Sequence, residues 1–401
     1  MSGLTPLEDA LGQVLSDVRA TEAVETVPLA RALGRTLAED IYATVDVPPA
    51  DNSAMDGYAI RVADSATLLP VLQRIPAGQA GSSLAPGTAA RIFTGAPVPP
   101  GADAVVMQEN AESQGDSVRI LEPPKAGENI RPRGQDIKRG ASVLPAGRRL
   151  RAEDLGVIAS VGVSELPVRR KLVIAVLSTG DELVEPAEAA LAPGQIFNSN
   201  RYTLIGLLQS HGFEVLDLGM VPDNPGSTRE ALSQAAAQSD CVITTGGVSV
   251  GEEDHVRAQV EALGKLNLWK LKLKPGKPLA FGSIGKAAFF GLPGNPAAVY
   301  VTFAMVVRPW LLRRQGALEE VPLKLMAKAE FDFRRAGTRL EFLRGKLRME
   351  EGICKVALHP NQSSGVLSSV AWANALIIVE PGVTIARGES VPVLLLDQLN
   401  R

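Results

Sequence analysis

The 401-residue chain has little of what several structural and functional classes depend on. It contains two cysteines, three histidines and only 4% aromatic residues. Cys241 and Cys354 are far apart in sequence and lack the close spacing of metal ligands. Three histidines in this length argue against a histidine-based zinc site. So few cysteines are typical of a protein of the reducing cytosol.

Long apolar runs and strong net charge are missing from the sequence as well. The longest apolar stretch, 297–307, is much shorter than the ~20 residues that a membrane-spanning helix needs. The N-terminal segment carries Glu8 and Asp9, where a secretory signal would be basic. The net charge is −3, whereas nucleic-acid-binding proteins are usually basic. We therefore expect a cytoplasmic protein that binds neither membranes nor nucleic acid.

Glycine and proline, in contrast, are abundant, at 38 and 28 residues. The apolar fraction of 45% is high enough for a folded core, so these residues are expected in structured turns rather than in disorder. A single core rarely grows beyond ~250–300 residues, and the chain should therefore divide into about two to four domains.

The middle of the chain alternates between strand-like and helix-like segments. We predict, in chain order, a strand at 172–177, a helix at 202–210, a strand at 214–218, a helix at 227–238, a strand at 241–244, a helix at 253–263, strands at 270–273 and 287–290, and an apolar helix that runs through 310. This alternation predicts an α/β fold with a central doubly wound parallel sheet.

The flanking regions have a different character. Short apolar runs broken by Gly and Pro predict a small β-rich domain at 46–137, and the residues after 319 predict a C-terminal β domain. Thr5 to Glu8 has the pattern of a capping box that begins a first helix, and another helix should begin near Glu153. We predict four domains: 1–45 with 138–170, 46–137, 171–318 and 319–401.

Ligands of doubly wound sheets bind in the loops beyond the carboxyl ends of the strands. Three such loops are expected here, at 178–182, 245–251 and 291–296. Glycines in the last two expose backbone N–H groups near a helix N-terminus, which suits a phosphorylated ligand. No Gly-Lys-Ser/Thr follows, so neither loop is a Walker A motif. The alternative, a glycine turn without a ligand, stays open.

Charged side chains in and near these loops allow two interpretations. Glu182, Asp223 and Asp254 follow strands and serve either as helix caps or as oxygen ligands of Mg²⁺. Lys270 and Lys274 alternate along a predicted strand together with Lys272, and Lys277 follows. They form either a solvated strand face or a clamp for phosphate or another oxyanion.

Seven motifs occur in an order that identifies a family. They are DNSAMDGYA at 51–59, FTGAPVP at 93–99, NIRPRGQDI at 129–137, STGDEL at 178–183, TGGVSVG at 245–251, KPGKP at 274–278 and GLPGNP at 291–296. With them the chain closely resembles the molybdopterin molybdenumtransferases, the group of bacterial MoeA and the gephyrin E domain, over nearly its whole length.

The resemblance implies a fold and a reaction. Family members are elongated homodimers of four-domain subunits with a C-terminal β-barrel-like domain, and two subunits share each active-site cleft. They use Mg²⁺ to insert molybdenum from molybdate into adenylylated molybdopterin, and they release AMP and molybdenum cofactor. The implied partners are the molybdopterin adenylyltransferase of the same pathway and the molybdoenzymes, or their chaperones, that accept the cofactor.

The resemblance also assigns site residues. Those assigned to catalysis are Asp56, Thr94, Asp136, Glu182, Asp223 and Asp254, and the last three also hold the metal. Those assigned to substrate binding are Gly246, Gly247, Ser249, Lys270, Lys274, Lys277, Pro293, Pro296, Arg344 and Ser364. The chain departs from the family at 361–364, where Asn-Gln-Ser-Ser replaces the common His-Gln-Gly-Ser. Pro132 and Gln135 replace the more usual Arg and Glu.

Two other functions fit the resemblance less well. The receptor-clustering role of the gephyrin relative goes with an added N-terminal domain and a long linker, which this sequence does not show. Other enzymes share the α/β module, including the adenylyltransferase and a nicotinamide amidase-linked domain. The motifs at 51–59 and 93–99 lie outside that module and disfavour them. Molybdate and tungstate stay open as the oxyanion, because they have nearly the same size and charge.

Overall fold

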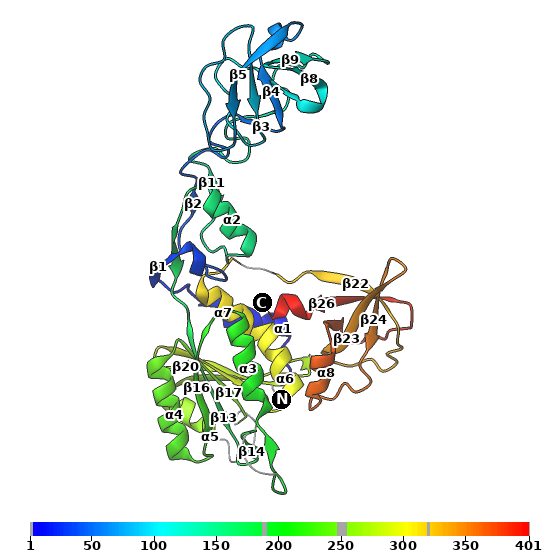
Figure 1. The fold of residues 1–401 in the computed structure, drawn as a ribbon. Coiled ribbons are helices and arrows are strands. Elements are labelled where there is room, and N and C mark those ends of the chain that lie inside the picture. The colour runs from blue at the N-terminus through cyan, green and yellow to red at the C-terminus, as the bar shows by residue number, and fades with distance from the viewer. Residues whose placement is uncertain (1–2, 187–190, 247–254, 319–320, 401) are drawn as a thin grey trace. The chain divides into compact units, whose positions relative to one another are not determined.

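The computed structural model describes residues 3–186, 191–246, 255–318 and 321–400 (Figure 1). Contacts between residues divide the chain into two units. The first, here the sheet-and-barrel unit, comprises Met1–Glu25, Gly34–Thr36 and Arg169–Arg401. The second, here the β-rich unit, comprises Thr26–Leu33 and Leu37–Val168. Each unit is described by itself, and the four predicted domain boundaries stay a prediction.

The β-rich unit is built on a six-stranded sheet with the order β7-β4-β6-β5-β9-β8. Its strands are β4 (Gly57–Ile60), β5 (Leu68–Ile75), β6 (Ala89–Ile92), β7 (Ala104–Met107), β8 (Ala111–Gln114) and β9 (Ser117–Ile120). Shorter elements complete it: β2 (Ile41–Tyr42), β3 (Asn52–Ser53), β10 (Ile130–Arg131), β11 (Ser142–Leu144), α2 (Ala152–Ser160) and the 3₁₀ turns η1 (Leu29–Arg31), η2 (Val62–Asp64) and η3 (Gln108–Asn110). β1 (Val24–Pro28) and β12 (Glu165–Arg169) lie where the two units meet in the sequence. The predicted run of short strands is therefore confirmed.

The sheet-and-barrel unit contains a second six-stranded sheet, with the order β16-β13-β17-β21-β20-β18. Its strands are β13 (Val173–Thr179), β16 (Glu214–Val221), β17 (Cys241–Thr245), β18 (Gly264–Lys270), β20 (Pro278–Ile284) and β21 (Ala287–Leu292). The first four in the spatial order are parallel, which confirms the predicted parallel sheet. β20 and β18 add an antiparallel edge that the sequence analysis did not predict.

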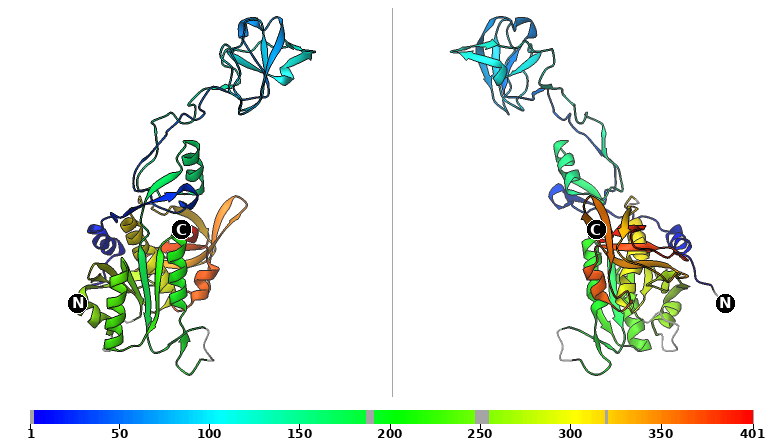
Figure 2. Two further views of the ribbon diagram at one scale, coloured as in Figure 1. Left: turned by 60° about the vertical axis from the view of Figure 1, so that its left-hand side comes forward. Right: turned by 90° about the vertical axis from the view of Figure 1, so that its right-hand side faces the viewer.

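Helices cover both faces of this sheet (Figure 1; Figure 2). Ile174 and Val176 of β13 face one core with Leu204 of α3 (Ser199–Ser210), while Ala175 and Leu177 face the other. The first core also contains α1 (Leu7–Ser16), α6 (Pro296–Thr302), the π-helical turn η4 (Phe303–Val307) and α7 (Arg308–Gln315). The second contains α4 (Pro225–Gln238) and α5 (His255–Leu263). This alternation produces the near-continuous apolar run of a strand that is buried on both faces.

The C-terminal strands close into a five-stranded barrel. Their order is β23-β24-β22-β26-β25, and an additional pairing of β23 with β25 completes the ring. The bounds are β22 (Lys324–Ala329), β23 (Leu340–Glu350), β24 (Ile353–Leu358), β25 (Ala375–Val379) and β26 (Ser390–Leu395), with the short helices α8 (Leu367–Trp372) and α9 (Leu396–Leu399). Phe342, Leu376 and Leu394 of the barrel belong to the same core as α6, so barrel and sheet are packed together.

Two local predictions are wrong. The strand expected at 270–273 does not exist as one element, because β18 ends at Lys270 and β19 (Leu273–Lys274) pairs with β23 of the barrel. The capping box at Thr5 does not form either. Thr5 is extended, donates its N–H to Lys270 O at 2.9 Å and accepts from Lys272 N–H at 2.7 Å, and α1 begins after it without a side-chain cap.

The helix expected near Glu153 is confirmed as α2. The carboxylate of Asp154 in its first turn accepts the N–H of Arg151 at 2.8 Å, as an N-terminal acidic residue should. Among the described helices, none is long and apolar enough to cross a membrane.

Candidate functional site

Four parallel strands end at one edge of the sheet in the sheet-and-barrel unit, here called the carboxyl edge. β13 connects to β16 on one side and β17 lies on its other side, so the topological switch point lies between β13 and β17. Ligand crevices of doubly wound sheets form at this point. β18 runs in the same direction as β21, because each is antiparallel to β20. The ends of β18 and the start of β20 therefore lie on the same edge.

The switch point is lined closely by backbone. Gly246, directly after β17, has a φ of 84°, and a Cβ built there would lie 2.8 Å from the carbonyl oxygen of Thr179. A side chain at this position therefore meets both an unfavourable φ and a collision. Only glycine lets the two loops approach so closely, and the N–H of Gly246 itself donates to Leu292 O at 3.3 Å.

Buried polar atoms gather beside this switch point. The hydroxyl oxygens of Ser178 and Thr245 are 3.1 Å apart. Thr179 Oγ1 and Asn198 Nδ2 are buried and have no hydrogen-bond partner within the described ranges. Buried polar atoms are nearly always hydrogen-bonded in folded proteins, so unpartnered ones mark a place where a polar ligand, ion or water is accommodated. Sequence analysis did not single out Asn198, although Asn before a predicted helix is a recognisable signal.

One end of the carboxyl edge is acidic; the acidic end is defined here as Glu182 and Asp223. Thr179 and Val221 are register partners in β13 and β16, and the two carboxylates follow them by three and two residues. Glu182 folds back so that its carboxylate covers Gly180, where a Cβ would lie 2.6 Å from Oε2. Neither carboxylate has a hydrogen-bond or ion-pair partner in the part of the chain that the structure describes.

The helix-cap interpretation of these two carboxylates is wrong. Asn224, the residue after Asp223, is the N-cap of α4 and accepts Ser227 N–H at 2.9 Å. Glu182 lies between β13 and β14 (Leu183–Val184), which pairs with β15 (Ile196–Phe197), so no helix follows it. Oxygen donors without partners suit a hard cation. No cluster of three or more metal-ligating side chains occurs among the described residues, and the third predicted ligand, Asp254, lies outside them together with Gly247 and Ser249.

The opposite end of the carboxyl edge is basic. Lys270 ends β18, and Lys277 precedes β20; both side chains are exposed. Lys274 forms an ion pair of 2.9 Å with Glu341, which is only 3% exposed and lies on β23. Leu271 and Leu273 are buried, whereas Lys270 and Lys274 are exposed, so the segment alternates as the predicted common face of the lysines requires.

Arg344 on β23 is a buried cation. It is 1% exposed, and its guanidinium donates to Ser369 Oγ at 3.0 Å, to Ser363 O at 3.1 Å and to Phe342 O at 3.3 Å. It makes no ion pair with any carboxylate of the described residues. Burial lowers the pKa of Arg344 to about 10. A charge buried without a counterion is costly, so the three acceptors have to stabilise it.

The loop that contains Ser363, one of the three acceptors of Arg344, reaches the carboxyl edge directly. Ser364 O accepts Ala297 N–H at 2.9 Å at the start of α6, so Ser364 touches the loop that contains Pro293 and Pro296. Pro293 is buried, and Pro296 is the first residue of α6. The sequence-predicted residues Arg344, Ser364, Pro293 and Pro296 therefore do come together. The basic side is defined here as Lys270, Lys274, Lys277 and Arg344.

In the β-rich unit, three of the motifs meet. Asp56 Oδ1 accepts the N–H of Thr94 at 2.7 Å and its hydroxyl at 2.8 Å. These two hydrogen bonds hold the pKa of Asp56 below its usual value. β3 of the first motif pairs with β10 of the third, and Arg133 N–H donates to Asp51 Oδ1 at 2.7 Å.

Asp136 is exposed, and its N–H donates to Val47 O at 2.9 Å. Its carboxylate makes no hydrogen bond to Asp56 or Thr94. A residue that the sequence analysis missed lies beside that pair: Arg91, two residues before the FTGAPVP motif, donates to Gly57 O and to Gln108 Oε1. Its position next to the motif was the available signal.

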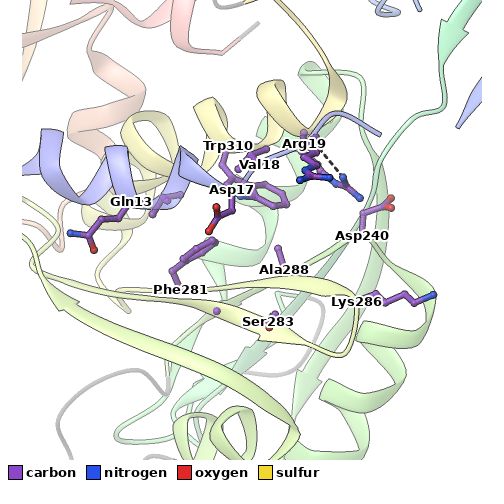
Figure 3. Close-up of a pocket in the computed structure, with 13 residues that line it drawn as sticks. Gln13, Asp17, Val18, Arg19, Asp240, Phe281, Ser283, Lys286, Ala288 and Trp310 are labelled. Carbon is purple, nitrogen blue, oxygen red and sulfur yellow. Dashed lines mark hydrogen bonds between the residues drawn. The ribbon is translucent and has the colours of Figure 1, made fainter. Parts of the chain in front are cut away.

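A cavity of about 390 Å³ lies away from the carboxyl edge (Figure 3). Phe281 of β20 and Trp310 of α7 form its apolar wall beside α1. Asp240, which directly precedes β17, also lines the cavity, so the cavity lies at the edge of the sheet where the parallel strands begin. None of the predicted site residues lines it. Its other charged lining residues are of both signs: Asp17, Arg19, Lys286 and Arg314. Such a lining selects no particular ligand chemistry.

Fold and loops together define a doubly wound α/β protein with buried, unpartnered polar atoms at its switch point. Family models match along the chain: "MoeA N-terminal region (domain I and II)" at residues 5–162, "Probable molybdopterin binding domain" at 175–313 and "MoeA C-terminal region (domain IV)" at 326–396. The chain belongs to the MoeA family of molybdopterin molybdenumtransferases, which act in molybdenum cofactor biosynthesis.

Individual relatives agree with this assignment. A protein of Haemophilus influenzae named molybdopterin molybdenumtransferase is 40% identical over 96% of this chain and 97% of its own length. A Nostoc protein of the same name is 39% identical over 93% and 88%. The crystal structure of the molybdopterin biosynthesis moeA protein from Pyrococcus horikoshii is 32% identical, with a TM-score of 0.85 over 98% of this chain and 100% of that one.

Proposed function

We propose that this chain inserts molybdenum from molybdate into adenylylated molybdopterin and releases AMP and molybdenum cofactor. The observation that carries the proposal is the charge order along the carboxyl edge, with the acidic end at β16 and β13 and the lysines at β20 and β18. Strands are ~4.8 Å apart, so six strands span about 24 Å. An extended ligand with a phosphate-linked nucleotide at one end and an oxyanion-accepting dithiolene at the other suits that span.

The acidic end suits Mg²⁺. Glu182 and Asp223 would hold it together with Asp254, since carboxylate oxygens are the ligands that Mg²⁺ takes beside phosphates. When bound, the ion offsets charge on the phosphate oxygens as the adenylyl linkage breaks. The chain's own contribution is to orient the nucleotide: Gly246 lets the loops after β13 and β17 approach each other closely, and the unpartnered Thr179 hydroxyl would donate to the phosphates.

The basic side suits the oxyanion. Molybdate is a dianion, and the buried guanidinium of Arg344 supplies a fixed positive charge beside Ser364 and the N-terminus of α6. Lys270 and Lys277 are exposed, so their side chains can reorient toward the anion. Glu341 holds Lys274 at this side, so its charge is oriented in advance. Tungstate meets the same groups equally well.

The β-rich unit is proposed to act in a homodimer, where Asp56, Thr94 and Asp136 of one subunit complete the site of the partner subunit. Thr94 keeps Asp56 ionised, which suits a carboxylate that positions a water or a metal-bound phosphate. We place the dimer in the cytoplasm, between the molybdopterin adenylyltransferase that supplies its substrate and the molybdoenzymes or chaperones that accept the cofactor.

The proposal is tested with purified chain, adenylylated molybdopterin and Mg²⁺, to which molybdate or tungstate is added in separate reactions. AMP and active cofactor are measured. AMP should appear with at least one oxyanion, and Asp254→Ala should abolish cofactor release while the dimer stays intact. If neither oxyanion produces AMP, the transferase function is refuted; if Asp254→Ala is fully active, the metal site is.

A further inference from the structure

The Asp56 turn in the β-rich unit is exposed to solvent, yet its carboxylate is oriented by Thr94. Such a turn keeps one geometry only if its backbone is also held. Gly57, the next residue, lies so close to β7 that a Cβ there would be 1.8 Å from Val106 O. Asp56 O accepts Gln108 N–H at 3.0 Å. The backbone from the Asp56 carbonyl to Gly57 is therefore tied to its neighbours.

One side chain joins these ties. Arg91 on β6 is the register partner of Tyr58 on β4, so it lies across from the start of that strand. Its Nη1 donates to Gly57 O at 3.0 Å and its Nη2 donates to Gln108 Oε1 at 2.7 Å. A planar guanidinium with two donors at fixed spacing makes both contacts at once, which a lysine cannot do with its single nitrogen.

Aromatic rings restrict the Arg91 guanidinium further. It lies 5.1 Å from the ring centroid of Tyr58 and 4.8 Å from that of Phe93. Phe93 is the residue before Thr94, the donor to Asp56. Arg91 therefore contacts Gly57, which follows Asp56, and Gln108, whose N–H holds the Asp56 carbonyl. It also contacts Phe93, which precedes Thr94. Cation–π contacts of this kind add to the two hydrogen bonds.

We propose that Arg91 is a positioning residue that fixes the Asp56–Thr94 pair for the transfer reaction. The proposal rests on the proposed function, in which that pair completes the site. Arg91 also acts through its charge: after the two Thr94 hydrogen bonds, its positive charge contributes to the lowered pKa of Asp56. Arg91 thus orients the turn that carries the carboxylate and adds to its ionisation, which the two Thr94 hydrogen bonds mainly determine.

The chain offers a matched control in Arg74. It is the register partner of Arg91 on β5, and its guanidinium lies 4.6 Å from the same Phe93 ring. Among the described residues it makes no hydrogen bond to the Asp56 turn. Arg74→Gln removes the same charge and the same kind of ring contact from the same sheet, but it leaves the ties of Asp56 in place.

The test compares Arg91→Gln, Arg91→Lys and Arg74→Gln in the full chain by the pH profile of kcat/KM for AMP release. We expect Arg91→Gln to lower kcat/KM about tenfold or more and to move the acidic limb of the profile to higher pH. Arg91→Lys should return the acidic limb to its original pH but restore only part of kcat/KM, because it supplies the charge without the two-donor geometry. Arg74→Gln should stay within about twofold of the parent chain.

A second readout does not depend on activity. The pKa of Asp56, followed by carbon NMR of aspartate-labelled chain and assigned with Asp56→Asn, should rise in Arg91→Gln and stay unchanged in Arg74→Gln. An unchanged Asp56 pKa together with an unchanged pH profile in Arg91→Gln would overturn the role of Arg91. Full activity of Asp56→Asn would instead refute the proposed function of the pair, and the NMR titration would still decide whether Arg91 controls it.

Discussion

The two ends of the carboxyl edge carry opposite charges, and the protein holds them in opposite ways. Glu182 and Asp223 at the acidic end have no partners among the described residues. On the basic side, Lys274 is paired with a buried carboxylate, and Arg344 is enclosed by three hydrogen-bond acceptors. Charges left open exchange a ligand at low structural cost, whereas enclosed charges contribute to the fold. Substitutions at the acidic end should therefore change activity alone, whereas substitutions on the basic side should change stability as well.

The largest effect is expected at the acidic end. The double variant Glu182→Gln/Asp223→Asn should lower AMP release about 100-fold or more, the scale for loss of a group that stabilises developing charge. Its free energy of unfolding should stay within about 0.5 kcal/mol, because neither side chain contributes to packing. Glu214→Gln, at the other end of β16, is the control and should change neither quantity. If the double variant lost stability as well as AMP release, the distinction between the open acidic end and the enclosed basic side would be contradicted.

On the basic side, Arg344→Ala should reduce the free energy of unfolding by about 2–4 kcal/mol. It leaves three acceptors without their donor and opens a cavity in a buried strand. Urea denaturation measures this. Arg348→Ala, on the same strand but exposed and paired with Glu330, should cost no more than about 1 kcal/mol. Equal losses in the two variants would show that the burial of Arg344 has no energetic weight.

The switch point between the two ends should respond through backbone strain. Gly246→Ala adds a Cβ at 2.8 Å from Thr179 O and at a φ of 84°, and we expect a loss of about 1–3 kcal/mol in the free energy of unfolding. Gly194→Ala is matched, because Gly194 has a φ of 87° with no atom within 4 Å of its Cβ. Comparing the thermal unfolding of the two variants separates the effect of the collision from the effect of the positive φ, which both positions share. Identical melting curves would count against the close approach of the two loops.

The smallest effect concerns protonation in the β-rich unit. Thr94→Val removes one of the two hydrogen bonds that lower the pKa of Asp56, so this pKa should rise toward its ordinary value of 3.8. Because the pKa in the folded protein is lowered, the stabilisation from this carboxylate is present above pH 3.8 and is lost as the pH falls through the folded value. In Thr94→Val, that loss should begin at higher pH, as an acid titration of the Asp56 carboxyl signal reports. A titration that is the same in both proteins would contradict the hydrogen bond from the Thr94 hydroxyl to Asp56.

Much of this arrangement follows from the sequence, and its failures have physical causes. The buried run of β13 and the alternation after it predict the parallel sheet, and parallel strands bring Glu182 and Asp223 to one edge. β20 was missed because Pro278 at its start and Gly282 within it weaken a strand signal. Its antiparallel direction depends on pairing with β21, which local pattern does not report.

The barrel and Arg344 show a second kind of limit. Closure of the barrel depends on the pairing of β23 with β25, from Gly345 with Ala375 to Glu341 with Val379, which local sequence does not report. Arginine in a strand is usually an exposed residue, so nothing local predicts that Arg344 is 1% exposed. Only its resemblance to a family position singled it out. Four of the few aromatic residues lie together: Trp269, Phe281, Phe290 and Trp310 form one chain of ring contacts from β18 to α7.

The division of work along the carboxyl edge is tested most directly by single-turnover AMP release, with the concentrations of Mg²⁺ and molybdate varied independently. We predict that Glu182→Gln/Asp223→Asn raises the Mg²⁺ concentration needed for half-maximal release and leaves the molybdate requirement unchanged. Arg344→Lys should do the reverse. If both variants shift both requirements by the same factor, the acidic end and the basic side do not bind separate ligands, and the assignment of metal and oxyanion to opposite ends is wrong.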